Sequence, residues 1–329
     1  MIDARRAPFD RAALTLAGAS DDELVAALAG GERLGEGIGG EILGIDVDGV
    51  PVFVKRVPLT VTERAAPYDT GNLFGLPDFY QYGIGSAGFG AWRELTAHRL
   101  TTGWVRSGHC PGFPQLYHWR VLPRAPRPAP GVEEQVAYWD GSAAVGRRLT
   151  ELAAAESSLT LFLERLPYEL GPWLSERLAA GEHAAIGGVA RSTAAALKAM
   201  NDAGLLHFDA HPGNLLTDGR RVYVTDFGLA AHPSFGHPAF LRAHADYDRR
   251  LSEYFLTTWL AAEYGGRDWD TGVRLVSQAA TGALPPELDA APEEARDLIR
   301  ARAADSAALH EFFTALVGCS KHTRYPFGP

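Results

Sequence analysis

Two stretches in the second half of the chain decide the expected fold: His207-Phe208-Asp209-Ala210-His211-Pro212-Gly213-Asn214 and Asp226-Phe227-Gly228-Leu229-Ala230. Asp209 and Asn214 are five residues apart in a loop that follows a predicted helix, and Asp226 lies twelve residues beyond Asn214. A carboxylate that orients a hydroxyl nucleophile, with an amide and a second carboxylate whose oxygens suit Mg²⁺, is the minimum that phosphoryl transfer requires. The spacing therefore predicts a phosphoryl-transfer site.

A glycine-rich stretch lies upstream, where one predicted strand ends and the next begins. Gly35, Gly37 and Gly40 have the spacing G-x-G-x-x-G. Glycines let the backbone approach a polyphosphate closely and point its N–H groups at the oxygens. A strand rather than a helix follows, which differs from the dinucleotide-binding arrangement. In a chain with 36 glycines the same spacing also fits a flexible turn.

Lys55 ends the alternating run Val52-Phe53-Val54-Lys55, which predicts a strand. Only three of the 31 basic residues are Lys and the rest are Arg, so a general surface cation in this chain is nearly always Arg. A compact ammonium group suits a phosphate oxygen and a carboxylate partner. We expect Lys55 to face a cleft, with Glu94 on the next helix as its partner, rather than to be a solvated charge on an edge strand.

The chain divides into three expected regions. Residues 1–32 are predicted to form a helical extension, residues 33–165 a β-rich region with insertions near 57–90 and 123–157, and residues 166–329 a mostly helical region. Strands are expected at 41–45, 52–55, 115–122, 159–163, 215–216 and 222–224, and helices at 91–100, 182–203, 239–264, 271–281 and 292–317.

Over about residues 33–260 the chain resembles the protein-kinase superfamily. It has five motifs in the order found in that superfamily: the glycine loop, Lys55, Glu94, the H-x-D-x-x-x-x-N loop and Asp226-Phe227-Gly228. The resemblance implies an α+β, bilobal protein kinase-like fold. Its small β-rich N-lobe would be residues 33–165, and its larger, mostly helical C-lobe residues 166–329. ATP and Mg²⁺ are the implied cofactors.

The resemblance also implies roles for the residues that match. Lys55 would hold the α- and β-phosphates and pair with Glu94, and Asp209 would be the catalytic aspartate. Asn214 and Asp226 would coordinate Mg²⁺. The implied enzyme is an ATP-dependent phosphotransferase.

The nucleotide would be held at two further places. The glycine loop, with Gly35, Gly37 and Gly40, would cover the phosphates. Glu164-Arg165-Leu166 matches the hinge, where the backbone of Glu164 and Leu166 would bond the adenine edge.

Departures from the pattern leave the acceptor open. Phe208 stands where many regulated protein kinases have an Arg that pairs with a phosphorylated activation loop, so activation by loop phosphorylation is not expected. No Ala-Pro-Glu follows Asp226-Phe227-Gly228, and His211-Pro212-Gly213-Asn214 is similar to phosphotransferases of the aminoglycoside and choline kinase type. The expected acceptor is a Ser/Thr hydroxyl of a protein or peptide. The alternatives are a small-molecule hydroxyl and a pseudokinase that serves as a binding scaffold.

The insertion at 57–90 is rich in aromatic residues, which argues against simple disorder. We expect it to be either a lid or acceptor-docking element near the cleft, or a structural flap packed on the small lobe.

Charge and hydropathy exclude several classes of protein. The chain of 329 residues has 40 acidic and 31 basic side chains and a net charge of −9, which argues against a nucleic-acid or anionic-membrane surface. No run of about 18 uncharged apolar residues occurs, so no transmembrane helix is expected. Asp3 and Asp10 lie where a signal peptide needs an apolar core, which favours a cytoplasmic location. The sequence gives no indication of the oligomeric state.

Overall fold

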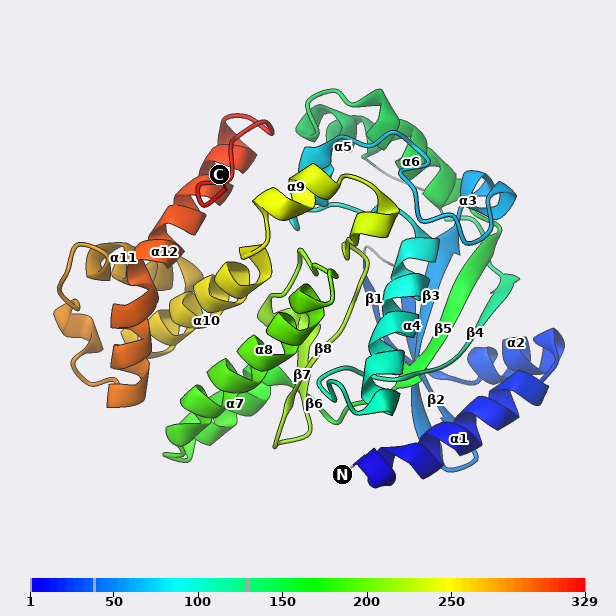
Figure 1. The fold of residues 1–329 in the computed structure, drawn as a ribbon, viewed down its shortest axis with the longest axis horizontal. Coiled ribbons are helices and arrows are strands. Elements are labelled where there is room, and N and C mark those ends of the chain that lie inside the picture. Colours follow the sequence, from blue (N-terminus) through cyan, green and yellow to red (C-terminus); the bar gives the residue numbers. More distant parts are fainter. Residues whose placement is uncertain (1, 38–39, 128–130, 329) are drawn as a thin grey trace. The chain divides into compact units, whose positions relative to one another are not determined.

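The computed structural model describes residues 2–37, 40–127 and 131–328, and it combines helices with a five-stranded antiparallel sheet (Figure 1). The predicted mixed α+β class is confirmed, whereas the bilobal kinase-like arrangement stays a prediction.

The chain forms two compact units. One contains Met1–Leu166 and also Asp226–His237, and the other contains Pro167–Thr225 and Pro238–Pro329. The Asp226-Phe227-Gly228 motif therefore belongs to the first unit, although the chain on both sides of the segment Asp226–His237 belongs to the second.

The first unit is built on the five-stranded sheet, whose strand order is β1-β2-β3-β5-β4 with every neighbouring pair antiparallel. The strands are β1 (Glu32–Gly37), β2 (Gly40–Val47), β3 (Val50–Leu59), β4 (Leu116–Pro123) and β5 (Ser157–Glu164). The helices of this unit are α1 (Ile2–Gly18), α2 (Asp21–Ala29), α3 (Val61–Ala65), α4 (Ala91–Ser107), α5 (Val132–Tyr138) and α6 (Ala143–Ala154), with the 3₁₀ turns η1 (Asp78–Gln81) and η3 (Pro233–Phe235).

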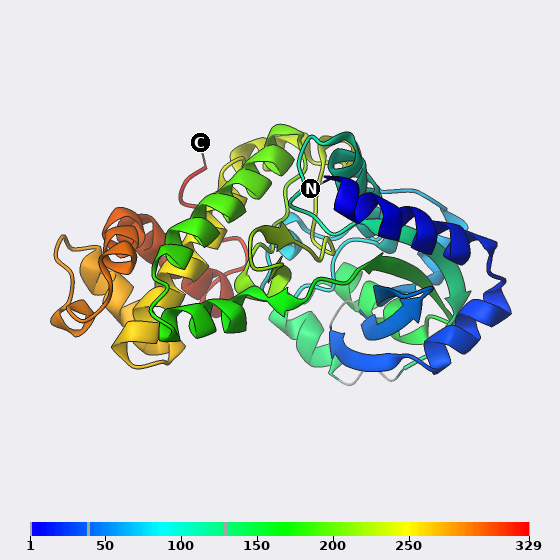
Figure 2. The ribbon, with the colours of Figure 1, turned by 90° about the horizontal axis from the view of Figure 1, so that it is seen from below.

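Alternation along the strands divides the apolar side chains between the two faces of the sheet. Val52 and Val54 of β3 pack with Phe162 of β5 in a cluster that includes residues of α1 and α2. Figure 2 shows these two helices beside the sheet. Val57 of β3 and Leu161 of β5 lie on the opposite face, in a cluster with residues of α4. Because successive side chains of a strand point to opposite faces, the odd-numbered positions of β3 face α4.

Most of the expected strands are confirmed, and several elements were missed. The sequence did not predict β1, α5, α6 or α7 (Leu170–Ala179). In β1 the sequence Glu-Arg-Leu-Gly-Glu-Gly has no alternation of apolar residues, so its pairing with β2 defines it.

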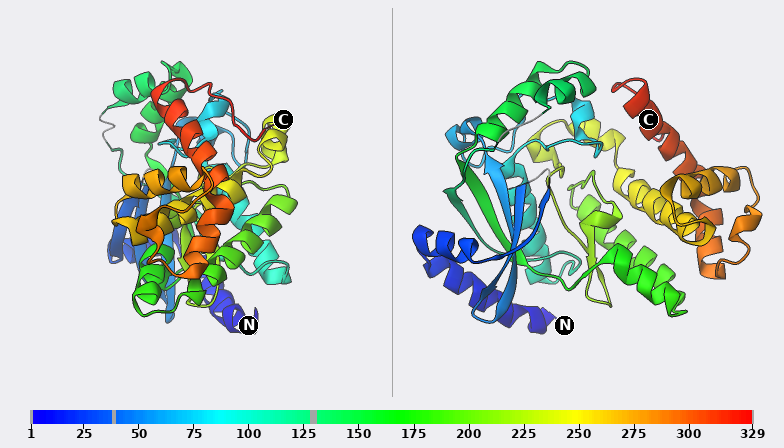
Figure 3. Two further views of the ribbon diagram at one scale, coloured as in Figure 1. Left: turned by 90° about the vertical axis from the view of Figure 1, so that its left-hand side faces the viewer. Right: turned by 180° about the vertical axis from the view of Figure 1, so that it is seen from behind.

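The second unit is mostly helical, and α12 packs against both α10 and α11 (Figure 3). A three-stranded sheet has the order β6-β7-β8. The elements are β6 (Tyr168–Glu169), α7, α8 (Ala184–Asp202), η2 (Pro212–Asn214), β7 (Leu215–Thr217), β8 (Val222–Val224), α9 (Pro238–Ala243), α10 (Tyr247–Gly265), α11 (Trp269–Ala279), η4 (Pro286–Leu288) and α12 (Glu293–Gly318).

The prediction of one continuous helix over 239–264 is wrong. The chain turns between α9 and α10, where the amide of Tyr247 bonds the carbonyl of His244 at 2.9 Å. The ring of His244 stacks on Phe240 and Tyr325 at centroid distances of 4.1 and 4.7 Å. Packing against the C-terminal Tyr325, which is remote in sequence, accompanies this break, and helical periodicity does not reveal such a contact.

The insertion at 57–90 packs into the first unit together with the chain around α5 and α6. Phe74 and Phe89 of the insertion are buried, and Trp139, which follows α5, is fully buried. The ring of Trp139 contacts Phe79 at 6.1 Å and Tyr80 at 4.6 Å between centroids. The aromatic residues of the insertion therefore form a core of their own.

No helix within the described ranges has both the length and the apolar character that crossing a bilayer requires.

Candidate active site

Lys55 is the centre of a buried cluster of charges in the first unit. As an odd-numbered residue of β3 it points to the α4 face of the sheet, and Glu94 lies in the first turn of α4. The Lys55 Nζ lies 2.7 Å from Glu94 Oε1 and 2.7 Å from Asp226 Oδ1. Lys55 and Glu94 are 5% and 3% exposed. The structure thus brings together three of the residues that the sequence singled out.

The charges of this cluster depend on one another. Burial alone lowers the pKa of Lys55, but the carboxylates of Asp226 and Glu94 outweigh burial, and the net shift of its pKa is upward. Burial raises the pKa of Glu94; the Lys55 charge lowers it, the Asp226 charge raises it, and the net shift is upward. The ammonium of Lys55 is therefore held in its charged form.

Asp226 is placed by its own backbone. It has a φ of 61°, a left-handed conformation that is uncommon for a residue other than glycine. Its Oδ1 accepts a hydrogen bond from the amide of Gly228 at 3.2 Å. The next side chain, Phe227, is fully buried, with centroid distances of 4.7 Å to His98 of α4 and 6.3 Å to Phe113. Phe227 thus anchors the motif in the core of the first unit.

The predicted glycine loop joins β1 to β2. Gly35 and Gly37 are in β1, Gly40 begins β2, and Gly37 is paired with Gly40. Ile38 and Gly39, between Gly37 and Gly40 in the sequence, lie outside the described residues. Gly40 has a φ of 126°, and a Cβ there would lie 2.1 Å from the carbonyl oxygen of Arg56. The close approach of two strands therefore requires glycine at position 40, independently of any phosphate.

The predicted hinge lies at the end of β5. The amide of Glu164 donates to the carbonyl of Gln115 at 2.8 Å, so an adenine contact at this residue would have to use its carbonyl. Leu166, the other predicted hinge residue, is the last residue before the chain enters the second unit.

Sequence reasoning missed Arg5, which holds the hinge. The Nε of Arg5 donates to Glu164 Oε1 at 2.8 Å, and its Nη2 pairs with Glu164 Oε2. The same guanidinium donates to the carbonyls of Pro111 at 2.9 Å and Phe113 at 2.6 Å. One arginine among 28, separated from Glu164 by 159 positions, gives no signal in the sequence alone.

The second unit holds the Asp209 loop. The Nδ2 of Asn214 donates to the carbonyl of Asp209 at 2.9 Å and to its Oδ2 at 3.0 Å. The amide of Asn214 donates to the carbonyl of His211 at 2.9 Å, and the Nε2 of His211 lies 3.6 Å from Asp209 Oδ2. The structure therefore brings Asp209 and Asn214 into direct contact.

Asp248 supports this loop from α10. It is fully buried, and its Oδ2 accepts from the amide of His207 at 2.6 Å and from Asn201 Nδ2 at 2.7 Å. Its Oδ1 accepts from the amide of Phe208 at 2.8 Å. A buried carboxylate is stable only when such donors satisfy it, so Asp248 and the loop depend on each other. Asp246 instead accepts from Tyr325 at 3.0 Å.

Phe208 belongs to a cluster of aromatic rings. It is fully buried at a φ of 63°, and its ring lies 5.0 Å from that of Tyr247 and 5.7 Å from that of Phe240. An aromatic side chain thus fills the core at the position where the resemblance led us to look for a cation.

The residues expected to bind Mg²⁺ have suitable chemistry. The side-chain Nδ2 of Asn214 donates to Asp209, which leaves the side-chain oxygen Oδ1 as the atom to offer a cation. Asp226 contacts Lys55 through Oδ1, while 43% of its side chain is exposed. Oxygen donors of this kind fit Mg²⁺. Among the described residues, no group of three or more His, Cys, Asp and Glu side chains has an arrangement that could hold a metal ion.

Comparison with known proteins found a family model that matches part of the chain. No curated protein matches the chain. Residues 106–240 match the model of the phosphotransferase enzyme family, a region that contains Asp209, Asn214 and Asp226 and begins after Lys55 and Glu94. This match confirms the predicted resemblance to the protein kinase-like superfamily with its aminoglycoside and choline kinases, and it confirms the prediction of a phosphotransferase enzyme.

Proposed function

We propose that the protein transfers the γ-phosphate of ATP, in the presence of Mg²⁺, to the hydroxyl group of an acceptor, and that its two units correspond to the lobes of a bilobal kinase-like fold. The observation that carries the proposal is the buried ion-pair cluster in which Lys55 lies 2.7 Å from both Glu94 and Asp226. Burying the charges of Lys55 and Glu94 is costly unless the arrangement has a use, and a fixed ammonium beside the partly exposed carboxylate of Asp226 suits a metal–triphosphate ligand.

Each residue has a definite part in this proposal. Lys55 neutralises the α- and β-phosphates, and Glu94 keeps its ammonium in place. Asp209 orients the acceptor hydroxyl and accepts its proton, with Asn214 fixing the carboxylate through the hydrogen bond at 3.0 Å. Catalysis then consists of positioning and neutralising charge.

The remaining groups hold the nucleotide and the metal. The amides of the loop with Gly35, Gly37 and Gly40 face the phosphates, and the backbone of Glu164 and Leu166 receives the adenine edge. Asn214 and Asp226 hold the cation through oxygen atoms. Mg²⁺ held by these two residues would supply positive charge that neutralises the charge developing on the phosphates during transfer.

A small-molecule hydroxyl is the acceptor that we favour over a Ser/Thr hydroxyl of a protein. The segment Asp226–His237 is packed into the first unit, with the carbonyls of Leu229 and Phe235 bonded to Gln81 and Arg93. A segment held in this way has little freedom to dock a peptide. His211-Pro212-Gly213-Asn214 and the match to the phosphotransferase enzyme family support the same choice. The glycine loop and Asp226-Phe227-Gly228-Leu229-Ala230 keep the protein acceptor as the second candidate.

Transfer from labelled ATP tests the proposal and separates the two acceptors. Wild type and Asp209→Ala are offered aminoglycosides, amino alcohols, peptides and unfolded protein in parallel. We expect Asp209→Ala to lower kcat by about 10²-fold or more while ATP still binds. Asp270→Ala, an exposed aspartate in the first turn of α11, is the control and should transfer at the rate of wild type. Equal rates in wild type and Asp209→Ala would remove Asp209 from the mechanism.

A further inference from the structure

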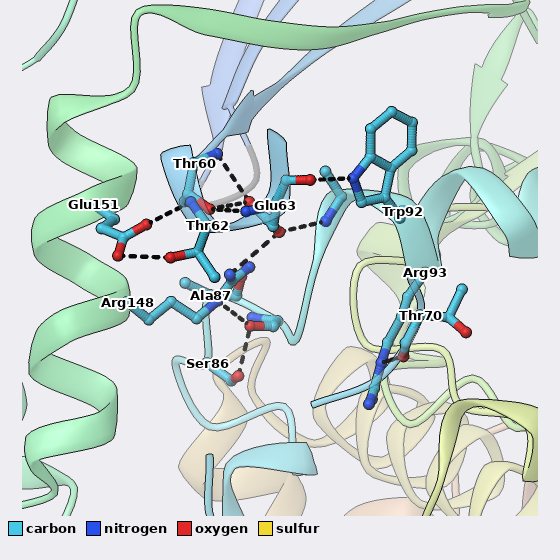
Figure 4. A network of polar contacts seen from close by, with 12 residues as sticks. Thr60, Thr62, Glu63, Thr70, Ser86, Ala87, Trp92, Arg93, Arg148 and Glu151 are labelled. Carbon is cyan, nitrogen blue, oxygen red and sulfur yellow. Dashed lines mark hydrogen bonds and ion pairs between the residues drawn. The ribbon is translucent and has the colours of Figure 1, made fainter. Parts of the chain in front are cut away.

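The carboxylate of Glu63 bonds the chain at both ends of the insertion at 57–90, and this residue is 1% exposed. Glu63 Oε2 accepts from the Thr60 amide at 2.9 Å and from its hydroxyl at 2.7 Å, which closes a capping box on α3. Glu63 Oε1 accepts from the amide of Ala91 at 2.8 Å, and its carbonyl accepts from Trp92 Nε1 at 2.8 Å (Figure 4). Ala91 is the first residue of α4, so Glu63 fixes the start of the helix that carries Glu94.

Arg148 of α6 ties the far end of the insertion to the same carboxylate. Its side chain is 3% exposed, and its Nη1 lies 3.4 Å from Glu63 Oε1. Its Nε donates to the carbonyl of Gly88 at 2.5 Å and its Nη2 to that of Ala87 at 3.4 Å (Figure 4). A buried arginine that uses its donors in this way fixes the backbone of the turn at 87–88.

That turn is packed directly on the motif that contains Asp226. A Cβ at Gly88, which has a φ of 72°, would lie 2.4 Å from the carbonyl oxygen of Gly228. One residue further along, the carbonyl of Leu229 accepts from Gln81 Nε2. The backbone of the insertion therefore contacts the chain two residues after Asp226.

The later part of the segment Asp226–His237 is bound to the same region. Arg93 donates from Nε to the carbonyl of Thr70 at 2.5 Å and from Nη2 to that of Phe235 at 3.1 Å. The Nδ1 of His237 lies 3.0 Å from Asp78 Oδ1. Contacts at positions 228, 229, 235 and 237 hold the segment along most of its length.

We propose that the insertion at 57–90 is a built-in brace for Asp226, and that Glu63, Gln81, Gly88 and Arg148 are positioning residues for the metal-binding carboxylate. The inference rests on the proposed function, because it assigns Asp226 to Mg²⁺. Phe208 is buried in the core, so the loop that contains Asp209 has no cation at position 208 to bind a phosphorylated segment. The brace supplies the fixed geometry through permanent packing and hydrogen bonds instead.

The brace makes a different prediction from a lid or an acceptor-docking element. A lid would change the KM for the acceptor when it is weakened. A brace would change the concentration of Mg²⁺ that half-saturates nucleotide binding, because a loosened Asp226 holds the cation in the right place for only part of the time.

The insertion offers a matched pair of glycines for the test. Gly88 and Gly75 both have positive φ, 72° and 67°, so an alanine strains the backbone at both positions. At Gly75 an added Cβ would have nothing within 4 Å, whereas at Gly88 it would meet Gly228. The difference between Gly88→Ala and Gly75→Ala therefore isolates the contact with the Asp226 motif. Gln81→Ala is a second test variant that introduces no added bulk.

Two readouts are measured on the full chain. Hydrogen–deuterium exchange of peptides from residues 226–237 should be about tenfold faster in Gly88→Ala and Gln81→Ala than in Gly75→Ala and wild type. Titration with Mg²⁺ in the presence of a non-hydrolysable ATP analogue, followed by thermal shift, should show a several-fold higher half-saturating concentration in the same two variants.

The outcomes separate the inference from the proposed function. Unchanged exchange in both Gly88→Ala and Gln81→Ala would overturn the brace. Faster exchange with an unchanged Mg²⁺ titration would overturn the positioning role, as would a change confined to the KM for the acceptor. A wild type that neither binds the Mg²⁺–nucleotide complex nor transfers phosphate would refute the proposed function.

Discussion

The guanidinium of Arg5, in the first turn of α1, forms a bidentate ion pair with the carboxylate of Glu164, the last residue of β5. It also donates to two carbonyls, those of Pro111 and Phe113, in the chain that leads into β4. The helical extension at the start of the chain is thus joined to the strand end that would receive adenine. A segment that the sequence treated as an appendage belongs structurally to the proposed nucleotide site.

The first prediction follows from that ion pair. Arg5→Ala removes the cation that pairs with the partly buried carboxylate of Glu164. Without this ion pair, the end of β5 is less firmly held and can shift. We expect the KM for ATP to rise by about tenfold, with a smaller effect on kcat, because a contact with adenine is made equally in the ground and transition states. Arg6→Ala is the control, since Arg6 is largely exposed and pairs with the exposed Asp10 at 3.9 Å. An equal KM for Arg5→Ala and Arg6→Ala would separate α1 from nucleotide binding.

The second prediction concerns the type of cation at position 55. Lys55→Arg keeps the charge but places a broad planar guanidinium where one nitrogen now contacts two carboxylates at 2.7 Å in a buried site. We expect phosphotransfer to fall by about 10²-fold or more in steady-state assays. The reciprocal change at the next residue, Arg56→Lys, is the control, because that side chain points to the other side and pairs with Glu41. Full activity in Lys55→Arg would move the phosphate contact to another residue.

The third prediction is a pH dependence with a definite sign. The folded-state pKa of Lys55 is raised, so its contribution to stability is fully present below its ordinary value of 10.5 and is lost only as the pH rises through the higher folded value. In wild type, binding of an ATP analogue should therefore show no Lys55 titration between about pH 7 and 10. Burial lowers the pKa of Lys55, whereas Asp226 and Glu94 raise it. Because Glu94→Gln removes one of these two carboxylates, we expect the pKa of Lys55 to be lower in this variant. Analogue binding in Glu94→Gln should weaken toward alkaline pH within that interval, and a pH profile parallel to that of wild type would contradict this account.

The sequence was sufficient for the parts of the fold that depend on local order. The alternation in Val52-Phe53-Val54-Lys55 predicted a strand, and the parity of that strand is what directs Lys55 to the α4 face. The spacing of Asp209 and Asn214 likewise predicted that both belong to one loop after a helix, and in that loop the structure places the two side chains in contact. In both cases the information lies within a few residues along the chain.

The sequence was not sufficient where long-range packing decides. The pairing of Arg5 with Glu164 and of Arg148 with Glu63 joins residues that are far apart, and nothing distinguishes these arginines from the others. The break between α9 and α10 coincides with packing of His244 on Tyr325, which is remote in sequence. The assignment of residues 226–237 to the first unit was also beyond local patterns, since it follows from contacts with the insertion.

The fourth prediction concerns Asp248 of α10, which accepts hydrogen bonds from the loop that contains Asp209. Asp248→Ala leaves the amides of His207 and Phe208 and the side chain of Asn201 without their acceptor in a fully buried site. Hydrogen bonds to a charged group contribute about 1.5–3 kcal/mol each and are not additive, so we expect a loss of about 3 kcal/mol in the free energy of unfolding, measured in urea. Asp202→Ala removes an exposed carboxylate paired with Lys198 and should cost no more than about 1 kcal/mol. Because Asp209 directly follows Phe208, kcat should also fall in Asp248→Ala under conditions where the protein remains folded. A variant as stable and as active as Asp202→Ala would show that the loop is held by its other contacts.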